Sequence, residues 1–141
     1  MRFMIIVKAT PDSEAGRFPE DSEPLFAAMA AYHEELARAG ALLDASGLQP
    51  SRKGWRVQYG EGGKRTVVDG PFTESKELVA GYTLIQTRSR EEAMEWSRRF
   101  PNPIGEGIPC HIEVRQLYEM DDFDGMVSEQ TAGRFRELGV K

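Results

Sequence analysis

The chain has 141 residues, with 18 Lys and Arg against 23 Asp and Glu, two His, one Cys and a formal net charge of -5. This length fits one domain that can bury a core without disulfides or a structural metal. The acidic balance argues against nucleic-acid binding, and no apolar run approaches the length of a signal sequence or a membrane span. The single Cys110 favours a reducing, cytoplasmic setting.

The first half of the chain predicts strands, a helix and a hairpin, from its apolar spacing and its turn residues. In chain order we expect a buried strand at Phe3 to Lys8, a surface loop at Ser13 to Asp21, a helix at Pro24 to Ala39, a strand at Leu42 to Leu48, a half-buried strand at Trp55 to Tyr59, a turn at Gly60 to Gly63 and a returning strand at Arg65 to Val68.

The second half repeats the order of strand, helix and strand. We expect one helical turn at Thr73 to Glu77, a central strand at Leu78 to Thr87, a helix that Ser89 and Glu92 cap and Pro101 ends, a strand at His111 to Tyr118, and an acidic tail at 121–141 with a short helix.

This order predicts an α+β domain, the ferredoxin-like βαββαβ fold with an inserted β-hairpin. Both helices then cover one face of the sheet, and the strands present too much apolar surface on the other face for a monomer. We therefore expect a homodimer whose interface includes the face that carries Glu113 and Arg115. A cross-strand ion pair is the structural alternative for these two charges.

Several kinds of site are not supported by the sequence. The glycines at Gly60 to Gly63 lack the spacing of a phosphate-binding loop. His33, His111 and Cys110 do not have the spacing of a known metal site, and no nucleophile motif is present. We expect no metal or other cofactor.

Two residues keep both a chemical and a structural interpretation. His33 lies at the border of the apolar helix face, where it is either a general base or a partly exposed helix residue. Asp69 opens the turn Asp69-Gly70-Pro71-Phe72. In the structural interpretation its carboxylate bonds the amides of the turn and Gly70 takes a positive φ; in the chemical one, Asp69 is an acid–base group.

The motifs resemble those of the YciI-like family, in its DGPF-domain branch, over roughly residues 1–120. They are Val68-Asp69-Gly70-Pro71-Phe72-Thr73-Glu74-Ser75-Lys76-Glu77, Gly81-Tyr82, Glu91-Glu92-Ala93-Met94-Glu95-Trp96 and Ile112-Glu113-Val114-Arg115. Gln116 departs from the pattern, which usually has Pro there. The resemblance implies a dimeric α+β barrel with proton-transfer chemistry of isomerase or lyase type on a small cyclic or aromatic compound. It makes His33 and Asp69 the acid–base pair.

The binding residues expected around this pair are Phe72, Lys76, Glu77, Tyr82, Trp96, Glu113 and Arg115. We expect Asp69, Phe72, Lys76, Glu77, His33 and Arg115 to line one cleft. The alternative function is a non-catalytic ligand-binding or regulatory partner protein, because members of this branch are commonly encoded beside extracytoplasmic-function sigma factors. In that case the acidic tail, Asp121 to Lys141, is a docking segment; the structural alternative is that it packs on its own subunit. For Phe72, Tyr82 and Trp96 the structural alternative is core packing.

Overall fold

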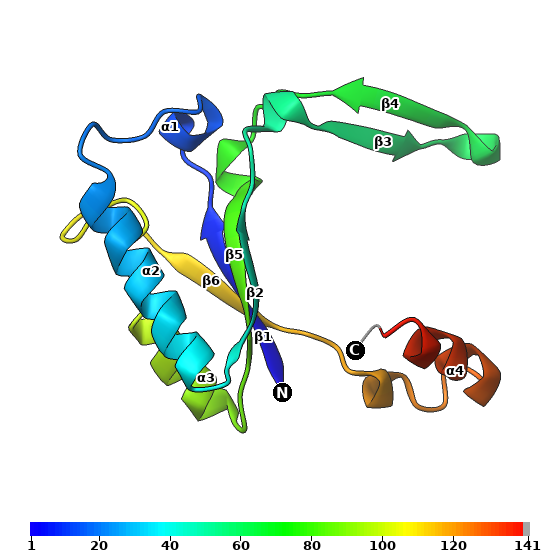
Figure 1. Cartoon of the computed structure of the whole chain (residues 1–141). Helices are drawn as coiled ribbons and strands as arrows, with labels where there is room; N and C mark the ends of the chain where they lie inside the picture. Colours follow the sequence, from blue (N-terminus) through cyan, green and yellow to red (C-terminus); the bar gives the residue numbers. More distant parts are fainter. Residues whose placement is uncertain (140–141) are drawn as a thin grey trace.

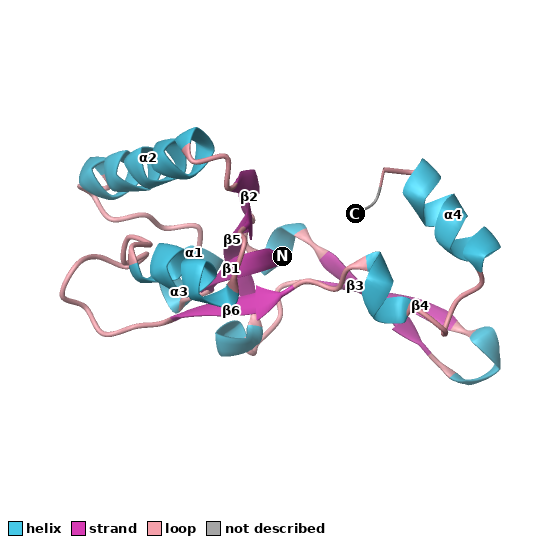
Figure 2. Ribbon diagram, turned by 90° about the horizontal axis from the view of Figure 1, so that it is seen from below, coloured by secondary structure: helices cyan, strands magenta, loops and turns pink. Residues whose placement is uncertain are grey.

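A computed structural model of the chain describes residues 1–139, with Ser75 described by its backbone only. An antiparallel sheet has the strand order β2-β5-β1-β6. Its strands are β1 (Arg2–Lys8), β2 (Leu42–Gly47), β5 (Val79–Gln86) and β6 (Ile112–Gln116). The helices α2 (Glu23–Arg38) and α3 (Arg90–Arg98) lie together on one face of this sheet (Figures 1 and 2). The α+β, ferredoxin-like prediction is confirmed.

The core lies between this sheet and the two helices. Ile5 of β1, Ile85 of β5 and Leu36 of α2 are completely buried. The Tyr32 hydroxyl of α2 donates a 2.7 Å hydrogen bond to the Trp96 carbonyl of α3, and the two rings meet edge to face. Trp96 is therefore a core residue that joins the two helices.

The expected caps set the start of α3. The Ser89 hydroxyl accepts a hydrogen bond from the Glu92 amide, as predicted. The Glu92 carboxylate accepts from the Arg88 amide, one residue before the position that the capping box predicts.

The inserted hairpin consists of β3 (Trp55–Tyr59) and β4 (Arg65–Asp69), joined by a 3₁₀ turn at Glu61–Gly63. Every residue of both strands is exposed, so the prediction that Trp55 to Tyr59 is half-buried is wrong for a single chain. The reason is visible in Figure 1, where the hairpin projects away from the sheet instead of packing on it.

One predicted loop contains a helical turn. The helix α1 (Pro11–Glu14) begins two residues before the segment expected as a surface loop and overlaps its start at Ser13 and Glu14. It forms because Thr10 and Ser13 cap each other and Pro11 occupies the first turn. In the tail, a 3₁₀ turn at Met120–Phe123 precedes α4 (Glu129–Glu137), which confirms the expected short helix. None of the helices within residues 1–139 has the length and apolar character that crossing a bilayer requires.

Candidate functional site

The turn after β4 is fixed by hydrogen bonds from two other segments. The Gly70 amide donates to the Gly54 carbonyl at 2.9 Å, and the Phe72 amide donates to Ser51 Oγ at 3.0 Å. Ser51 belongs to a 3₁₀ turn at Ser51–Lys53, and both its amide and its hydroxyl donate to the carboxylate of Glu14 in α1. Glu14 and Ser51 together hold the Asp69-Gly70-Pro71-Phe72 turn in place.

The Asp69 carboxylate has no part in holding this turn. Asp69 is exposed, and within the described residues its side chain has no hydrogen bond or ion pair. The expectation that it bonds the turn amides is therefore wrong, because the Gly54 carbonyl and the Ser51 hydroxyl accept those hydrogen bonds. Asp69 is therefore a carboxylate on a fixed turn, and both of its oxygens are free of partners among the described residues.

Gly70 has a different role from the expected one. Its φ is not positive, so the conformational reason for a glycine does not apply. A Cβ at this position would lie 1.9 Å from the Ser51 carbonyl oxygen. Glycine is needed here because the turn passes directly against the backbone of the Ser51–Lys53 segment.

The residues that follow the turn stay close to Asp69 along the chain. Phe72 is half-buried, and the Arg56 guanidinium lies 3.8 Å from the centre of its ring. Lys76 and Glu77 are exposed in the 3₁₀ turn at Ser75–Glu77, where the helical turn was predicted.

His33 is half-buried on α2, at the predicted border, and both ring nitrogens have partners. Nδ1 lies 2.7 Å from the Met29 carbonyl oxygen, and Nε2 lies 2.8 Å from Thr83 Oγ1. A carbonyl oxygen only accepts, so Nδ1 carries the proton in the neutral ring and Nε2 accepts from the Thr83 hydroxyl. Figures 1 and 2 place α2 and the hairpin on opposite sides of the sheet. A single chain therefore does not bring His33 to Asp69.

The face of the sheet opposite the helices carries a Tyr–Asp pair at the β2 side. The Tyr82 hydroxyl of β5 donates a 2.9 Å hydrogen bond to Asp44 of β2. This bond raises the pKa of the Tyr82 phenol, because deprotonation would place two anions together. Asp44 was not predicted as a site residue. Only the register of β2 on β5 would have revealed it, because Asp44 lies opposite Leu84 and Ser46 lies opposite Tyr82, which places Asp44 beside the Tyr82 side chain.

The β6 side of the same face carries the predicted charges. Glu113 lies 3.6 Å from Lys8 Nζ of β1 and 3.4 Å from Arg115 Nη1, so ion pairs do form here. Ile6 of β1 pairs with Tyr82 on one side and with Glu113 on the other, so both lie on one face.

Between these two polar edges the sheet is apolar. Met4, Ile6 and Leu84 are half-buried side chains on this face. We call this surface, from Asp44 and Tyr82 across to Glu113 and Arg115, the open face. It has an apolar middle with polar groups at both sides.

Neither of two concave regions in the described part of the chain unites the predicted residues. One of about 480 Å³ lies beside the loop after α3 and is lined by Phe100, Asn102, Cys110 and His111, among others. A second of about 260 Å³ lies between α3 and β6 and includes Arg115. Asp69, Phe72, Lys76, Glu77 and His33 border neither of these two regions. Within residues 1–139, no three His, Cys, Asp or Glu residues form a group that would hold a metal ion.

The fold and these residues define a ferredoxin-like α+β domain with a free carboxylate at the base of an inserted hairpin. A family model described as the YCII-related domain matches residues 1–120. The chain therefore belongs to this family, which confirms the YciI-like resemblance.

Two similar proteins extend the comparison. The uncharacterized protein R00369 of Rhizobium meliloti (strain 1021) is 30% identical over 83 residues, which are 59% of this chain and 66% of that protein. A solved structure of 5-chloro-2-hydroxyhydroquinone dehydrochlorinase (TftG) from Burkholderia phenoliruptrix AC1100, in complex with 2,5-dihydroxybenzoquinone, is 18% identical with a TM-score of 0.43. That match covers 84% of this chain and 94% of the TftG chain.

Proposed function

We propose that this protein binds a small cyclic or aromatic compound and that Asp69 transfers a proton to or from it. The observation that carries the proposal is the free carboxylate of Asp69 on a turn that Glu14 and Ser51 hold in place. A catalytic acid or base needs a fixed position together with oxygens that are not occupied by structural partners. His33 is not required, since Met29 and Thr83 occupy both of its nitrogens.

The open face supplies the second part of the proposal. Two copies of the chain pack with their open faces toward each other, because Met4, Ile6 and Leu84 give this face an apolar middle that water would otherwise contact. The hairpin leaves the sheet on this side (Figure 2). In the proposed dimer its base, which ends β4 at Asp69, therefore borders the space between the copies.

This space would suit a flat ring with polar substituents. The ring lies on the apolar middle, an anionic or hydroxyl group meets Arg115 or Tyr82 at the edges, and Phe72, Lys76 and Glu77 lie near the reacting carbon beside Asp69. Trp96 has no place in this site because it belongs to the core.

The chemical test is proton exchange. The protein is incubated in D₂O with a panel of enolisable cyclic ketones, lactones and hydroxylated aromatic acids, and deuterium incorporation is followed by NMR. Asp69→Asn should reduce exchange about 10²- to 10⁴-fold with an unchanged unfolding midpoint, because the carboxylate does not hold the turn. Glu61→Gln, an exposed carboxylate in the turn at the other end of the hairpin, is the matched control. Equal exchange by Asp69→Asn and the wild type would refute the catalytic role.

The assembly has a separate test. Sedimentation at micromolar concentration should show a dimer, whereas a compact monomer would contradict the packing of the open faces.

Binding without chemistry is the alternative function, as a ligand-binding or regulatory partner protein. It is favoured by the exposed apolar side chains of the tail, among them Met126 and Leu138, each 74% exposed. Ligand-observed NMR separates the two functions. Binding of a panel compound that survives Asp69→Asn, with no exchange by the wild type, would establish the binding role.

A further inference from the structure

Two segments project from the sheet, and we call them the hairpin arm (residues 55–69) and the tail arm (residues 119–139). The hairpin arm leaves after β2, whose last residue, Gly47, lies opposite Gly81, at the end of the sheet where Lys8 pairs with Val79. The tail arm leaves after β6, at the opposite end, where Gln116 pairs with Phe3. Both arms project on the open-face side (Figures 1 and 2).

The hairpin arm exposes an apolar face. The register places Val57 opposite Val67, and alternation puts Trp55 and Tyr59 on the same side. These side chains are 40–72% exposed. A two-stranded hairpin with nothing packed on it is marginal in water, so this face needs a cover.

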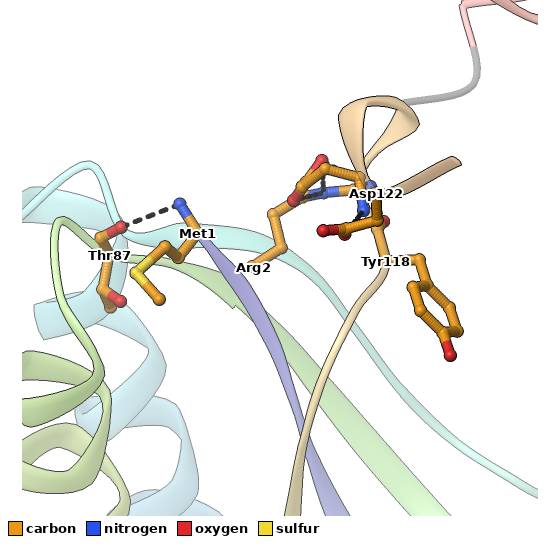
Figure 3. A network of polar contacts seen from close by, with 6 residues as sticks. Met1, Arg2, Thr87, Tyr118 and Asp122 are labelled. Carbon is orange, nitrogen blue, oxygen red and sulfur yellow. Dashed lines mark hydrogen bonds and ion pairs between the residues drawn. The ribbon is translucent and has the colours of Figure 1, made fainter. Parts of the chain in front are cut away.

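The tail arm is anchored at its root and exposed beyond it. Arg2 Nε donates to Glu119 at 2.9 Å, and the Glu119 amide donates to Asp122 (Figure 3). The hydrogen bond from Arg2 holds the pKa of the Glu119 carboxyl below its ordinary value. Beyond the root, the exposed apolar side chains are Met126, Val127, Phe135 and Leu138.

The two arms carry opposite charges. The hairpin arm includes three basic and two acidic side chains, and two more basic residues, Arg52 and Lys53, lie just before it. The tail arm includes six acidic and two basic side chains, and its first part, residues 119–129, holds five of the acidic ones and neither basic one. Within one chain the arms lie apart, because they leave opposite ends of the sheet (Figure 1). The charges that would complement each other do not meet inside the monomer.

A twofold axis between two facing sheets has two limiting directions. An axis parallel to the strands would bring each hairpin arm beside the partner's hairpin arm, basic against basic. An axis perpendicular to the strands exchanges the ends of the sheet, so that the hairpin arm of one copy meets the tail arm of the other. Like charges in contact are costly, whereas opposite charges steer association and fix its geometry.

We propose that a second copy of this chain occupies the space between the arms, with its tail arm packed along the apolar face of the hairpin arm. This inference rests on the proposed dimer. It adds the direction of the twofold axis and the contact between the hairpin arm of each copy and the tail arm of the other, which we call the arm exchange. The exchange covers Trp55, Val57, Tyr59 and Val67 with the apolar side chains of the partner's tail. It places the partner chain's acidic residues beside the basic hairpin.

Cross-linking tests the contact directly. In a Cys110→Ser background, one chain carries Tyr59→Cys and a second, size-tagged chain carries Met126→Cys; both replaced side chains are exposed. A short thiol-reactive cross-linker should join the two different chains efficiently, and it should join copies of the same variant poorly. Efficient linking of hairpin to hairpin would overturn the proposal. So would linking within one chain when both cysteines are present.

Charge exchange tests the orientation. The hairpin variant is Lys64→Glu with Arg65→Glu, and the tail variant is Asp121→Lys with Asp124→Lys. In a homodimer of the hairpin variant, acidic hairpins meet acidic tails. In a homodimer of the tail variant, the basic hairpin of each copy meets the two new lysines of the other copy's tail. Each should weaken that dimer about tenfold or more at low salt. A mixture of the two variants should form a heterodimer of near wild-type affinity, because every arm contact in it pairs opposite charges. Failure of the mixture to recover affinity would overturn the proposal.

A control and a second readout separate this inference from the dimer itself. Glu34→Lys with Glu91→Lys reverses two exposed charges on the helices and should leave dimer affinity unchanged. If sedimentation shows a wild-type dimer but neither cross-links nor charge recovery appear, the arm exchange is wrong and the packing of the open faces stands. A wild-type monomer removes both.

Discussion

Gly70→Ala tests whether the turn that presents Asp69 is fixed as the structure shows. An alanine Cβ would lie 1.9 Å from the Ser51 carbonyl oxygen and 2.6 Å from the Ser51 carbonyl carbon, whereas ordinary contacts begin at 3.4 Å. Backbone atoms cannot move aside as a flexible side chain can. The turn and the Ser51–Lys53 segment must therefore separate by about 1.5 Å to reach ordinary contact.

That separation breaks the hydrogen bonds from Gly70 to the Gly54 carbonyl and from Phe72 to Ser51 Oγ. At about 1 kcal/mol each, their loss costs about 2 kcal/mol. We expect a lower urea midpoint by far-UV circular dichroism and faster amide exchange in residues 55–69 by mass spectrometry. Gly54→Ala is the matched control, since its nearest contact, also with the Ser51 carbonyl oxygen, is an ordinary 3.6 Å. Equal effects of the two substitutions would refute the packing argument.

Two further predictions concern buried hydrogen bonds. Burial raises the pKa of Tyr32 from 10.0 to about 12, so the unfolded chain loses this proton first and stability should fall from about pH 10 to pH 12, by on the order of 2 kcal/mol. Tyr32→Phe should cost about 1 kcal/mol at pH 7 and make the alkaline decline shallower in urea unfolding; an unchanged decline would contradict this. Thr83→Val leaves His33 Nε2 without its donor and should lower the free energy of unfolding by about 1–2 kcal/mol. The loss should be smaller in a His33→Phe background, so additive costs in a double-mutant cycle would exclude the Thr83–His33 hydrogen bond.

Local pattern was enough to predict most of the fold. The Ile- and Val-rich strand before Lys8, the helix after Pro24 and the cap at Ser89 each follow from neighbours within a few residues, and the structure has all three. The hairpin was also found, but its burial was not. Alternation in Trp55–Tyr59 predicts an apolar face but not what covers it, and all five residues are exposed within the described part of one chain.

The candidate site depends on contacts across long stretches of sequence. The motif identifies Asp69 as a site residue. Its carboxylate is not used by the turn because Ser51, 18 positions earlier, accepts the hydrogen bond from the Phe72 amide that Asp69 was expected to accept. Asp44 was missed because its partner, Tyr82, lies 38 residues away, and only the register of β2 on β5 brings them together. Local spacing contains neither relation.

The strand order also constrains how the chain acquires its structure during synthesis. β1 precedes the other strands in the sequence, yet its two neighbours in the sheet are β5 and β6. No hydrogen-bonding partner for β1 exists until Val79 and the residues after it have left the ribosome. The Ile-rich strand β1 therefore stays without its sheet neighbours while residues 9–78, which separate it from β5, are made, and such late pairing of distant strands slows folding. Until then Ile5 and Ile6 lack the β5 and β6 residues opposite them, and transiently exposed apolar segments of this kind favour aggregation.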